Sequence, residues 1–322
     1  MKGRLPLLRL SRSFTLVEML AALTVFVILG LIVTEIVAMT SRSINVSNGG
    51  VGASAQAQIA FGRFDLDLAA LVKRADVDFA VGTANNSSSL ILLSVVSSAG
   101  SPSGGNRNAS LVSYQITAHA DNPGADGVAR PCLVRAGNAL GWTSTDFMGL
   151  DVNGLPVSLS GTLPTSLTFS ASDYDILAPG VLRMVIGFQL YPDNQAVTLA
   201  DGTTTSSKLA DGTIVYSPPV RTLATLSGGT ATFTDPSRIA ALVVGLVVVD
   251  TQTLRLLNST QVNAIAGQFL VPAKGQLPVQ AWASAADGLV SSLGGSIPHP
   301  PLQAVRVFEH FFPVTPYGTK MP

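Results

Sequence analysis

The spacing of hydrophobic positions changes twice along the chain, and its first part is a continuous apolar run. Residues 19–34 are all apolar, Thr or Gly, and the run extends from Phe14 to Met39 with two acidic interruptions. As an α-helix, these 26 residues measure about 39 Å, more than the roughly 30 Å hydrocarbon core of a bilayer. We therefore expect residues 14–47 to form a membrane-spanning helix.

A glycine-rich break and then an amphipathic helix are expected within residues 48–80. Three Gly occur in residues 49–52, and each costs a helix about 1 kcal/mol relative to Ala. Beyond them, apolar residues recur at alternating four- and three-residue steps and predict one apolar face: Ala57, Phe61, Phe64, Leu68, Leu71 and Ala75. Polar residues are expected away from that face: Gln58, Arg63, Asp65, Asp67 and Lys73. The stripe is short for a coiled coil, so we expect it to pack on the sheet that follows.

From residue 81 to 322, short apolar runs alternate with Gly, Ser, Asn and Pro, which predicts a β-rich head. The clearest strands are 90–96, 111–116, 181–191 and 239–249, the last apolar enough to be central. The predicted fold class is therefore α+β, a long membrane-spanning helix followed by a β-rich head.

Two further segments of the head have a distinct composition. Residues 192–237 form a polar, turn-rich insertion in which Leu-Ala-Asp-Gly-Thr occurs at 199–203 and 209–213, and Asp-Gly suits tight hairpin turns. Residues 291–301 are expected to be a Gly/Pro-rich linker before the apolar-aromatic segment 305–314.

Charge is concentrated in residues 1–13, a basic leader with no acid that contains Lys2, Arg4, Arg9 and Arg12. By the positive-inside rule, we expect the N-terminus in the cytoplasm and the head outside the cytoplasmic membrane. The whole chain has a formal net charge of zero, so loss of the leader's four positive charges leaves −4. No basic surface for nucleic acid is expected.

The junction Ser13-Phe14-Thr15-Leu16-Val17-Glu18 resembles the type IV prepilin signal. The resemblance implies cleavage by prepilin peptidase between Ser13 and Phe14, and it allows N-methylation of Phe14. Ser13 stands where that pattern nearly always has Gly.

Glu18 is costly in a membrane helix, by about 2.5–3.5 kcal/mol on insertion scales, so it needs a partner. The new α-amine of Phe14, from the same or a neighbouring subunit, would supply one and set the register of a fibre. The alternative is an uncleaved anchor whose Glu18 stays at the wet cytoplasmic edge. Glu35 is expected at the outer interface with no special role.

Several short blocks spread over the chain carry a further resemblance: residues 65–68, 74–78, 111–114, 133–135, 140–142, 174–183, 240–244 with Asp250, 305–308 and 311–312. In these blocks, within the group of pilin-type proteins, the chain resembles the J-type minor pseudopilins of type II secretion and, more closely, the Verru-Chthon cassette protein C family. The resemblance implies a pilin-like head, other pilin-like subunits as partners, and a role in a multi-pilin export or surface system.

No catalytic constellation, cofactor or metal site is predicted. His119, His299 and His310 lack the spacing of zinc ligands. Gly50-Val51-Gly52 mimics part of a dinucleotide fingerprint but follows a membrane helix instead of a strand. Asp76 and Asp78 are expected to be solvated or to cap a helix.

Two further features of the head have unremarkable explanations. Residues 121–127 are acidic and Gly-rich, but they lack the ligand spacing of an EF-hand, and Asx-turns account for them without calcium. Cys132 is the single cysteine, and we expect a buried thiol.

Three classes of function follow. The leading hypothesis is a structural, minor pilin-like subunit of a type IV pilus- or type II secretion-like fibre, and not an enzyme. The alternative is an unprocessed single-pass anchor with an extracytoplasmic binding domain. The third, a membrane-tethered hydrolase, has no nominated nucleophile.

Overall fold

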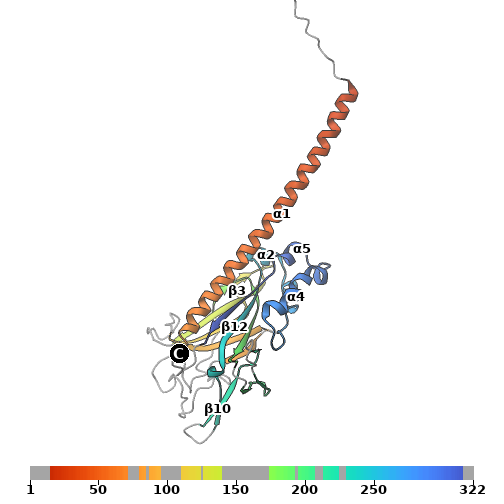
Figure 1. Ribbon diagram of the computed structural model, residues 1–322. Coiled ribbons are helices and arrows are strands. Elements are labelled where there is room, and N and C mark those ends of the chain that lie inside the picture. Colours follow the sequence, from red (N-terminus) through yellow and green to blue (C-terminus); the bar gives the residue numbers. More distant parts are fainter. Residues whose placement is uncertain are drawn as a thin grey trace, which may run out of the picture. The chain divides into compact units, whose positions relative to one another are not determined.

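The computed structural model describes residues 15–71, 80–84, 87–95, 110–124, 126–139, 174–192, 195–206, 213–224 and 230–314. The chain divides into two compact units, residues 1–48 and residues 49–322. Figure 1 traces the helices and strands in chain order. The fold is α+β, with a long apolar N-terminal helix and a β-rich head of antiparallel sheets.

Helix α1 (Leu16–Ala69) is one continuous α-helix of 54 residues, so the expected glycine-rich break is wrong. The glycines are points of close contact with the head. A Cβ on Gly49 would lie 3.8 Å from the Cβ atoms of Ala304 and Asp250, and one on Gly52 would lie 3.0 Å from Asp250 Oδ1. Close packing here offsets the intrinsic cost of about 1 kcal/mol per Gly.

The apolar face predicted for the second half of α1 packs on the head as expected. Its members within the described residues are buried or partly buried in one core: Ala57, Phe61, Phe64, Leu68 and Leu71. The helix ends before the predicted limit of residue 80, and Ala75 and Lys73 lie outside the described residues. One expectation is wrong, since Asp67, predicted on the polar side, is fully buried.

The first sheet is an antiparallel meander of five strands in the order β1-β2-β3-β4-β5. Its strands are β1 (Ala80–Ala84), β2 (Ser87–Ser94), β3 (Ser110–Pro123), β4 (Ala129–Ala139) and β5 (Tyr174–Ala178). The β3–β4 hairpin runs in register from Ser110 opposite Ala139 to His119 opposite Arg130. Gly127, at φ 71°, supplies the left-handed position of its turn.

The second sheet has the antiparallel order β13-β12-β6-β9. Its strands are β6 (Val181–Leu190), β9 (Ile214–Val215), β12 (Ile239–Val248) and β13 (Arg306–Pro313). The predicted central position of β12 is confirmed, because it pairs with β6 on one side and β13 on the other. The first sheet meets this one where the Ser88 hydroxyl accepts a 3.1 Å hydrogen bond from the Ile186 N–H.

The turn-rich insertion contains small hairpins instead of further core strands. They are β7 (Ala196–Thr198) with β8 (Thr204–Ser206), and β10 (Val220–Ala224) with β11 (Thr230–Thr234). The first Leu-Ala-Asp-Gly-Thr copy forms the predicted turn, with Gly202 at φ 82°. The second copy lies mostly outside the described residues.

Four helices fill the segment before β13, and the sequence patterns did not predict them. They are α2 (Thr251–Leu256), α3 (Ser259–Gly267), α4 (Pro278–Leu293) and α5 (His299–Gln303), and a 3₁₀ turn (Pro236–Arg238) precedes β12. The linker expected at residues 291–301 is therefore wrong, because its two ends belong to α4 and α5.

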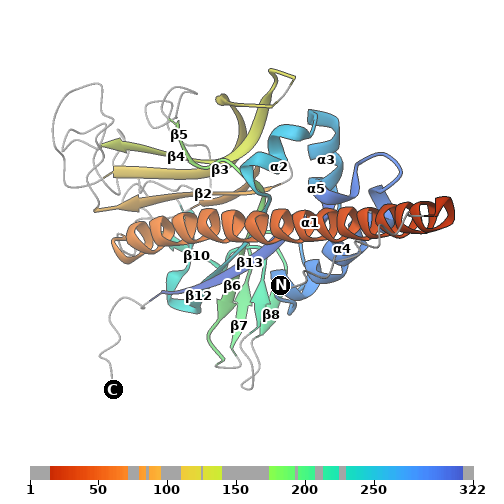
Figure 2. The ribbon, with the colours of Figure 1, turned by 90° about the horizontal axis from the view of Figure 1, so that it is seen from above.

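Two apolar clusters hold the head together. The larger one lies between the two sheets and the second half of α1. In Figure 2, α1 crosses the view with strands of the first sheet on one side and strands of the second sheet on the other. Phe64 contacts both sheets, with its ring 4.1 Å from that of Tyr114 on β3 and 6.0 Å from that of Phe312 on β13. The smaller cluster joins the opposite face of β6 and β12 to α2–α5. Because both faces of β6 and β12 are covered, these strands are apolar at nearly every position.

Candidate functional site: the N-terminal helix and its clamp in the head

Glu18 closes a capping box at the start of α1. The Thr15 N–H donates to Glu18 Oε2 at 3.0 Å, and the Glu18 N–H donates to Thr15 Oγ1 at 3.3 Å. The Thr15 hydroxyl also donates to Glu18 Oε2, at 3.1 Å. These reciprocal bonds satisfy backbone donors that a helix start otherwise leaves free. Ser13 and Phe14, the predicted cleavage pair, lie outside the described residues.

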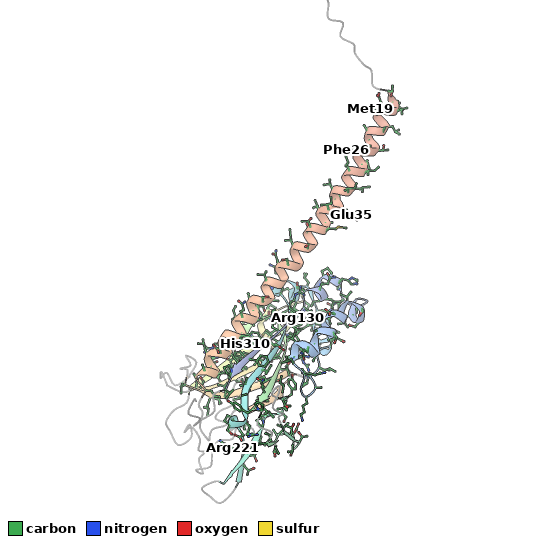
Figure 3. The ribbon with its side chains drawn as sticks, viewed as in Figure 1. Met19, Phe26, Glu35, Arg130, Arg221 and His310 are labelled. Atoms are coloured by element: carbon green, nitrogen blue, oxygen red, sulfur yellow. The ribbon has the colours of Figure 1, made fainter. Side chains whose placement is uncertain are left out.

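Downstream of Glu18, α1 exposes a long apolar surface. Residues Leu16–Ser41 form a span apolar and long enough to cross a membrane, and none of its most apolar stretch is buried. Figure 3 shows Met19, Phe26 and Glu35 along this part of the helix. Its hydroxyl side chains are turned onto the backbone, as Thr24 donates to the Ala21 carbonyl at 2.8 Å and Thr34 donates to the Gly30 carbonyl at 2.8 Å. The span therefore presents almost only hydrocarbon to its surroundings.

At the other end of α1, a buried carboxylate fastens the helix to the first sheet. Arg135 on β4 binds Asp67 with both arms of its guanidinium, Nε to Oδ2 at 2.7 Å and the second nitrogen to Oδ1 at 3.0 Å. Arg63, one turn earlier on α1, lies 3.4 Å from Asp67 Oδ1. The bidentate geometry fixes both distance and rotation of the helix against β4.

Tyr114 completes this clamp, which we define as Asp67, Arg135, Tyr114 and Arg63. Its hydroxyl donates to Asp67 Oδ2, and its ring stacks on Phe64. Burial and then the neighbouring Asp67 charge raise the pKa of the Tyr114 hydroxyl well above its usual value. Burial opposes the charge of Arg135, but the Asp67 carboxylate more than compensates and raises the Arg135 pKa. The Tyr114 hydroxyl therefore keeps its proton and Arg135 keeps its charge, the states in which both donate to Asp67.

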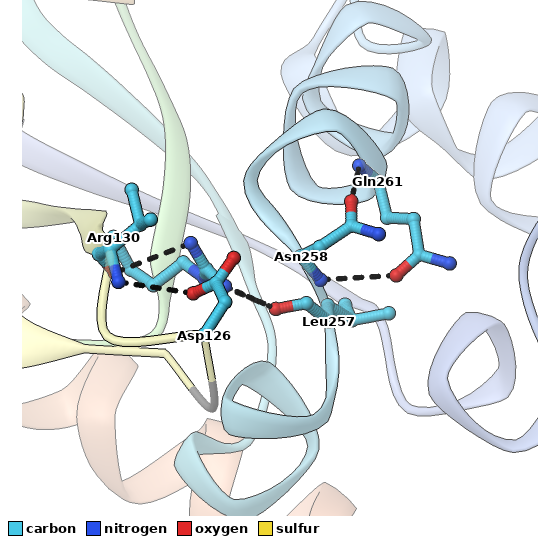
Figure 4. A network of polar contacts seen from close by, with 6 residues as sticks. Asp126, Arg130, Leu257, Asn258 and Gln261 are labelled. Carbon is cyan, nitrogen blue, oxygen red and sulfur yellow. Dashed lines mark hydrogen bonds and ion pairs between the residues drawn. The ribbon is translucent and has the colours of Figure 1, made fainter.

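A buried arginine on β4 joins the β3–β4 hairpin to the helical segment. Arg130 donates from Nε at 3.1 Å and from a terminal nitrogen at 2.7 Å to the carbonyl of Leu257, directly after α2 (Figure 4). The same nitrogen lies 2.5 Å from Asp126 Oδ1. The hydrogen bond from Arg130, followed by that from the Val128 N–H, lowers the pKa of Asp126.

Two further residues that the sequence singled out, Asp126 and Cys132, lie in or next to the β3–β4 hairpin. Asp126 accepts from the Val128 N–H at 3.1 Å, so the predicted Asx-turn is confirmed in the hairpin. Cys132 is buried on β4 as expected, and burial raises the pKa of its thiol to about 12. Asp76 and Asp78 lie outside the described residues.

The three histidines are not brought together in the described part of the chain. The His310 ring is tilted against that of Phe61 with ring centroids 5.4 Å apart, and His119 Nδ1 lies 3.7 Å from an Asp121 carboxylate oxygen. His299 begins α5. Across the described residues, no three His, Cys, Asp or Glu side chains form a group that could hold a metal ion.

Comparisons of the chain with protein-family models, curated proteins and solved structures found no match. The arguments about function therefore rest on the residues above. Sequence reasoning found Glu18 and the apolar span. It missed the clamp, for which the one available signal was the Arg63–Asp67 pair at helical spacing.

Proposed function

We propose that this chain is a structural, minor pilin-like subunit that is cleaved between Ser13 and Phe14 and assembled into a type IV pilus- or type II secretion-like fibre. In this proposal it is a single-pass protein of the cytoplasmic membrane, with the N-terminus in the cytoplasm and the head outside. Its partners are prepilin peptidase, membrane lipid and other pilin-like subunits.

The observation that carries the proposal is the 26-residue apolar span that the chain leaves exposed. Such a surface requires lipid or other apolar helices around it. The second half of the same helix is built into the head through the clamp, so a force or register imposed on the helix reaches the head through a buried, bidentate ion pair. This coupling suits a subunit held in a fibre by its helix.

The position of Glu18 also supports cleavage. Glu18 Oε2 accepts from the N–H of Thr15, the residue next to Phe14. Cleavage would place a positive α-amine within one residue of that carboxylate. In the uncleaved chain the same position is a neutral peptide, and the carboxylate keeps an uncompensated cost of about 2.5–3.5 kcal/mol in the membrane.

The alternative, an unprocessed single-pass anchor with an extracytoplasmic binding domain, is favoured by the capping box. Thr15 and Glu18 stabilise the helix start by themselves, typically by about 1 kcal/mol, without any second subunit. Under this alternative, the Glu18 charge is dispensable and only its hydrogen bonds matter.

Two variants of Glu18 separate these functions. Glu18→Gln keeps an oxygen that can accept from Thr15 but loses the charge, whereas Glu18→Ala loses both. If the chain is a fibre subunit, both variants should be inserted and cleaved but should co-purify poorly with their pilin partners. If the chain is an unprocessed anchor, Glu18→Gln should behave as the wild type. Glu35→Gln, in the same span, is the matched control and should be recovered normally.

Processing is measured directly by the intact mass of the protein from its native membranes, which reports both cleavage and N-methylation. We expect a chain that begins at Phe14. An N-terminus at Met1 in cells with active prepilin peptidase would contradict the proposal. Ser13→Gly should be cleaved equally well or faster, because Gly is the residue that the prepilin pattern prefers.

A further inference from the structure

We propose that the free edge of strand β13 binds an extended segment of another protein, which adds to the second sheet as a further antiparallel strand. The binding site consists of residues 307–311 and is called the β13 edge below. Its ligand is a segment with a basic residue at its centre and an apolar residue two positions to each side. This inference goes beyond the proposed function and does not depend on membrane anchoring, cleavage or a fibre.

The first step is the direction of the backbone groups of β13. In an antiparallel ladder, alternate residues of a strand bond to its neighbour, and the residues between them point the other way. The Val314 N–H donates to the carbonyl of Ala240 at 3.0 Å, so the even-numbered residues of β13 bond to β12. The N–H and C=O groups of Val307, Glu309 and Phe311 therefore point away from the sheet. They have no partner among the described residues, so they offer the hydrogen bonds that an added strand needs.

The second step is the length and regularity of this edge. β13 pairs with β12 through eight consecutive residues without a register shift. The edge strands of the first sheet, β1 and β5, have five residues each, and β5 has a register shift against β4. At the other side of the second sheet, β9 has two residues. Proteins commonly protect an edge by a short strand, a bulge or a proline, and residues 307–311 have none of these.

The third step is that α1 and α4 pack on the two faces of β13 and leave its edge accessible. On one face, the ring of His310 lies 5.4 Å from that of Phe61 on α1. On the other face, Glu309 Oε2 accepts from the Val279 N–H at the start of α4 at 2.9 Å. Residues 306–309 are partly exposed, and His310 and Phe311 are exposed. The edge is therefore open but held in place, which lowers the entropic cost of binding.

The fourth step is the charge of Glu309, which selects the occupant. Glu309 forms no ion pair among the described residues, and its side chain lies on the same face as those of Val307 and Phe311. If two copies of the edge paired about a two-fold axis and used all three outward residues, Glu309 would lie opposite its own copy. Like charges directly opposite each other are destabilising, whereas a basic residue of another chain would form a favourable pair there.

The test uses the full chain in detergent and a fluorescein-labelled peptide, Thr-Val-Thr-Lys-Thr-Val-Thr, whose binding is followed by anisotropy. One control peptide has Glu in place of Lys, and the other has N-methyl groups on its Val and Lys nitrogens. We expect the Lys peptide to bind and the Glu peptide to bind about fivefold more weakly, because a favourable charge pair becomes a like-charge pair. The N-methylated peptide should not bind, since it cannot donate to the edge.

Hydrogen exchange locates the bound peptide. The amides of the even-numbered residues of β13 are already bonded to β12, so the Lys peptide should slow exchange at Val307, Glu309 and Phe311. Absence of added protection at millimolar peptide would overturn the proposal. The same holds if the N-methylated peptide binds as tightly as the Lys peptide, or if the Lys and Glu peptides bind equally.

Matched variants of the protein test the same contacts. Phe311→Pro removes one outward N–H and leaves the bonds to β12, because Pro is tolerated where an edge nitrogen faces outward. Phe311→Ala is its control, since it loses the ring and keeps the N–H. We expect Pro to bind the Lys peptide about fivefold more weakly than Ala, the effect of one lost hydrogen bond. Protection of the even-numbered amides reports that both variants are folded, and equal affinity of the two would contradict the proposal.

Glu309→Gln tests the charge alone, because Gln keeps an oxygen that can accept from the Val279 N–H. It should remove the difference in affinity between the Lys and Glu peptides, and an unchanged difference would refute the role of Glu309. If the edge amides are protected without peptide, and more so at higher protein concentration, the occupant is a second copy and the proposal is overturned. These measurements are independent of the Glu18 variants and of the intact mass, so either proposal can fail alone.

Discussion

The clamp predicts a large loss of stability when Asp67 alone is changed. Asp67→Asn keeps the size of the side chain but removes the charge that both Arg135 and Arg63 face at 2.7 Å and 3.4 Å. Breaking a buried ion pair on one side typically costs about 3–5 kcal/mol, because the remaining charge stays buried without its partner. Since the Arg135 side chain is 15% exposed and Asn can still accept from Tyr114, we expect the lower end, about 3 kcal/mol.

The assay is thermal unfolding of the full chain in detergent, followed by tryptophan fluorescence, to which the buried Trp282 contributes. For a head of this size, about 3 kcal/mol should lower the unfolding midpoint by roughly 6–12 °C. The control is Asp65→Asn, an exposed carboxylate two residues earlier on the same helix, which should change the midpoint little. A midpoint for Asp67→Asn equal to that of the control would refute the clamp.

A paired substitution distinguishes loss of the ion pair from loss of packing. Asp67→Leu combined with Arg135→Met replaces both charges by apolar groups, and such replacements of buried ion pairs are often neutral or stabilising. The double variant should therefore be more stable than Asp67→Asn. If instead the loss of stability in the double variant equals the sum of the losses in Asp67→Leu and Arg135→Met measured separately, Asp67 and Arg135 do not act on each other.

Three further predictions concern the rest of the head. Glu309→Ala should cost about 1 kcal/mol and speed amide exchange in the first turn of α4, because Glu309 accepts from the Val279 N–H at 2.9 Å where that helix has no side-chain cap of its own; unchanged exchange would contradict this. Gly245→Ala should cost about 1–3 kcal/mol in chemical unfolding, since its Cβ would lie 2.4 Å from that of Pro278, and a neutral result would mean that α4 shifts freely. Cys132, whose pKa burial raises to about 12, should react with iodoacetamide at mildly alkaline pH only after unfolding, and its loss of a proton in the unfolded chain should make the folded state less stable as pH rises above the usual thiol pKa near 9; rapid alkylation of folded protein would contradict its burial.

Strands β2, β3, β6 and β12 and the inner face of α1 were predictable because the spacing of their apolar residues is enough to indicate them. Ile239–Val248 is apolar without alternation, which predicts a strand covered on both faces, and it lies between β6 and β13 with α2–α5 behind it. The four- and three-residue steps from Ala57 to Leu71 likewise predict one buried helix face, and Phe64 packs there.

The rest depended on partners far away in sequence. Asp67 and Arg135 are 68 residues apart, so a carboxylate that looks solvent-facing in the helix pattern is fully buried. Helix propensity alone predicts a break at the glycines of residues 49–52. Their contacts with Asp250 and Ala304 arise from tertiary packing, which propensity does not include. The face of α4 was hidden for a different reason, since several of the residues that pack it are alanines with little contrast to their neighbours: Ala281, Ala285 and Ala286.

The two acidic residues Glu18 and Asp67 lie in opposite halves of one helix, and their partners separate their roles. Asp67 is compensated within the chain, by a bidentate arginine and a tyrosine hydroxyl, so its charge serves the fold of the head. Glu18 has hydrogen bonds to Thr15 but no cationic partner among the described residues, and it lies near the start of a span apolar and long enough to cross a membrane. If this span lies in a membrane, as the proposed function requires, hydrogen bonds alone do not remove the cost of the charged carboxylate, and a compensating charge would come from outside the described residues. The proposed cleavage would create an amine at Phe14, next to Thr15, so the proposed function depends on the charge of Glu18, whereas the stability of the head does not.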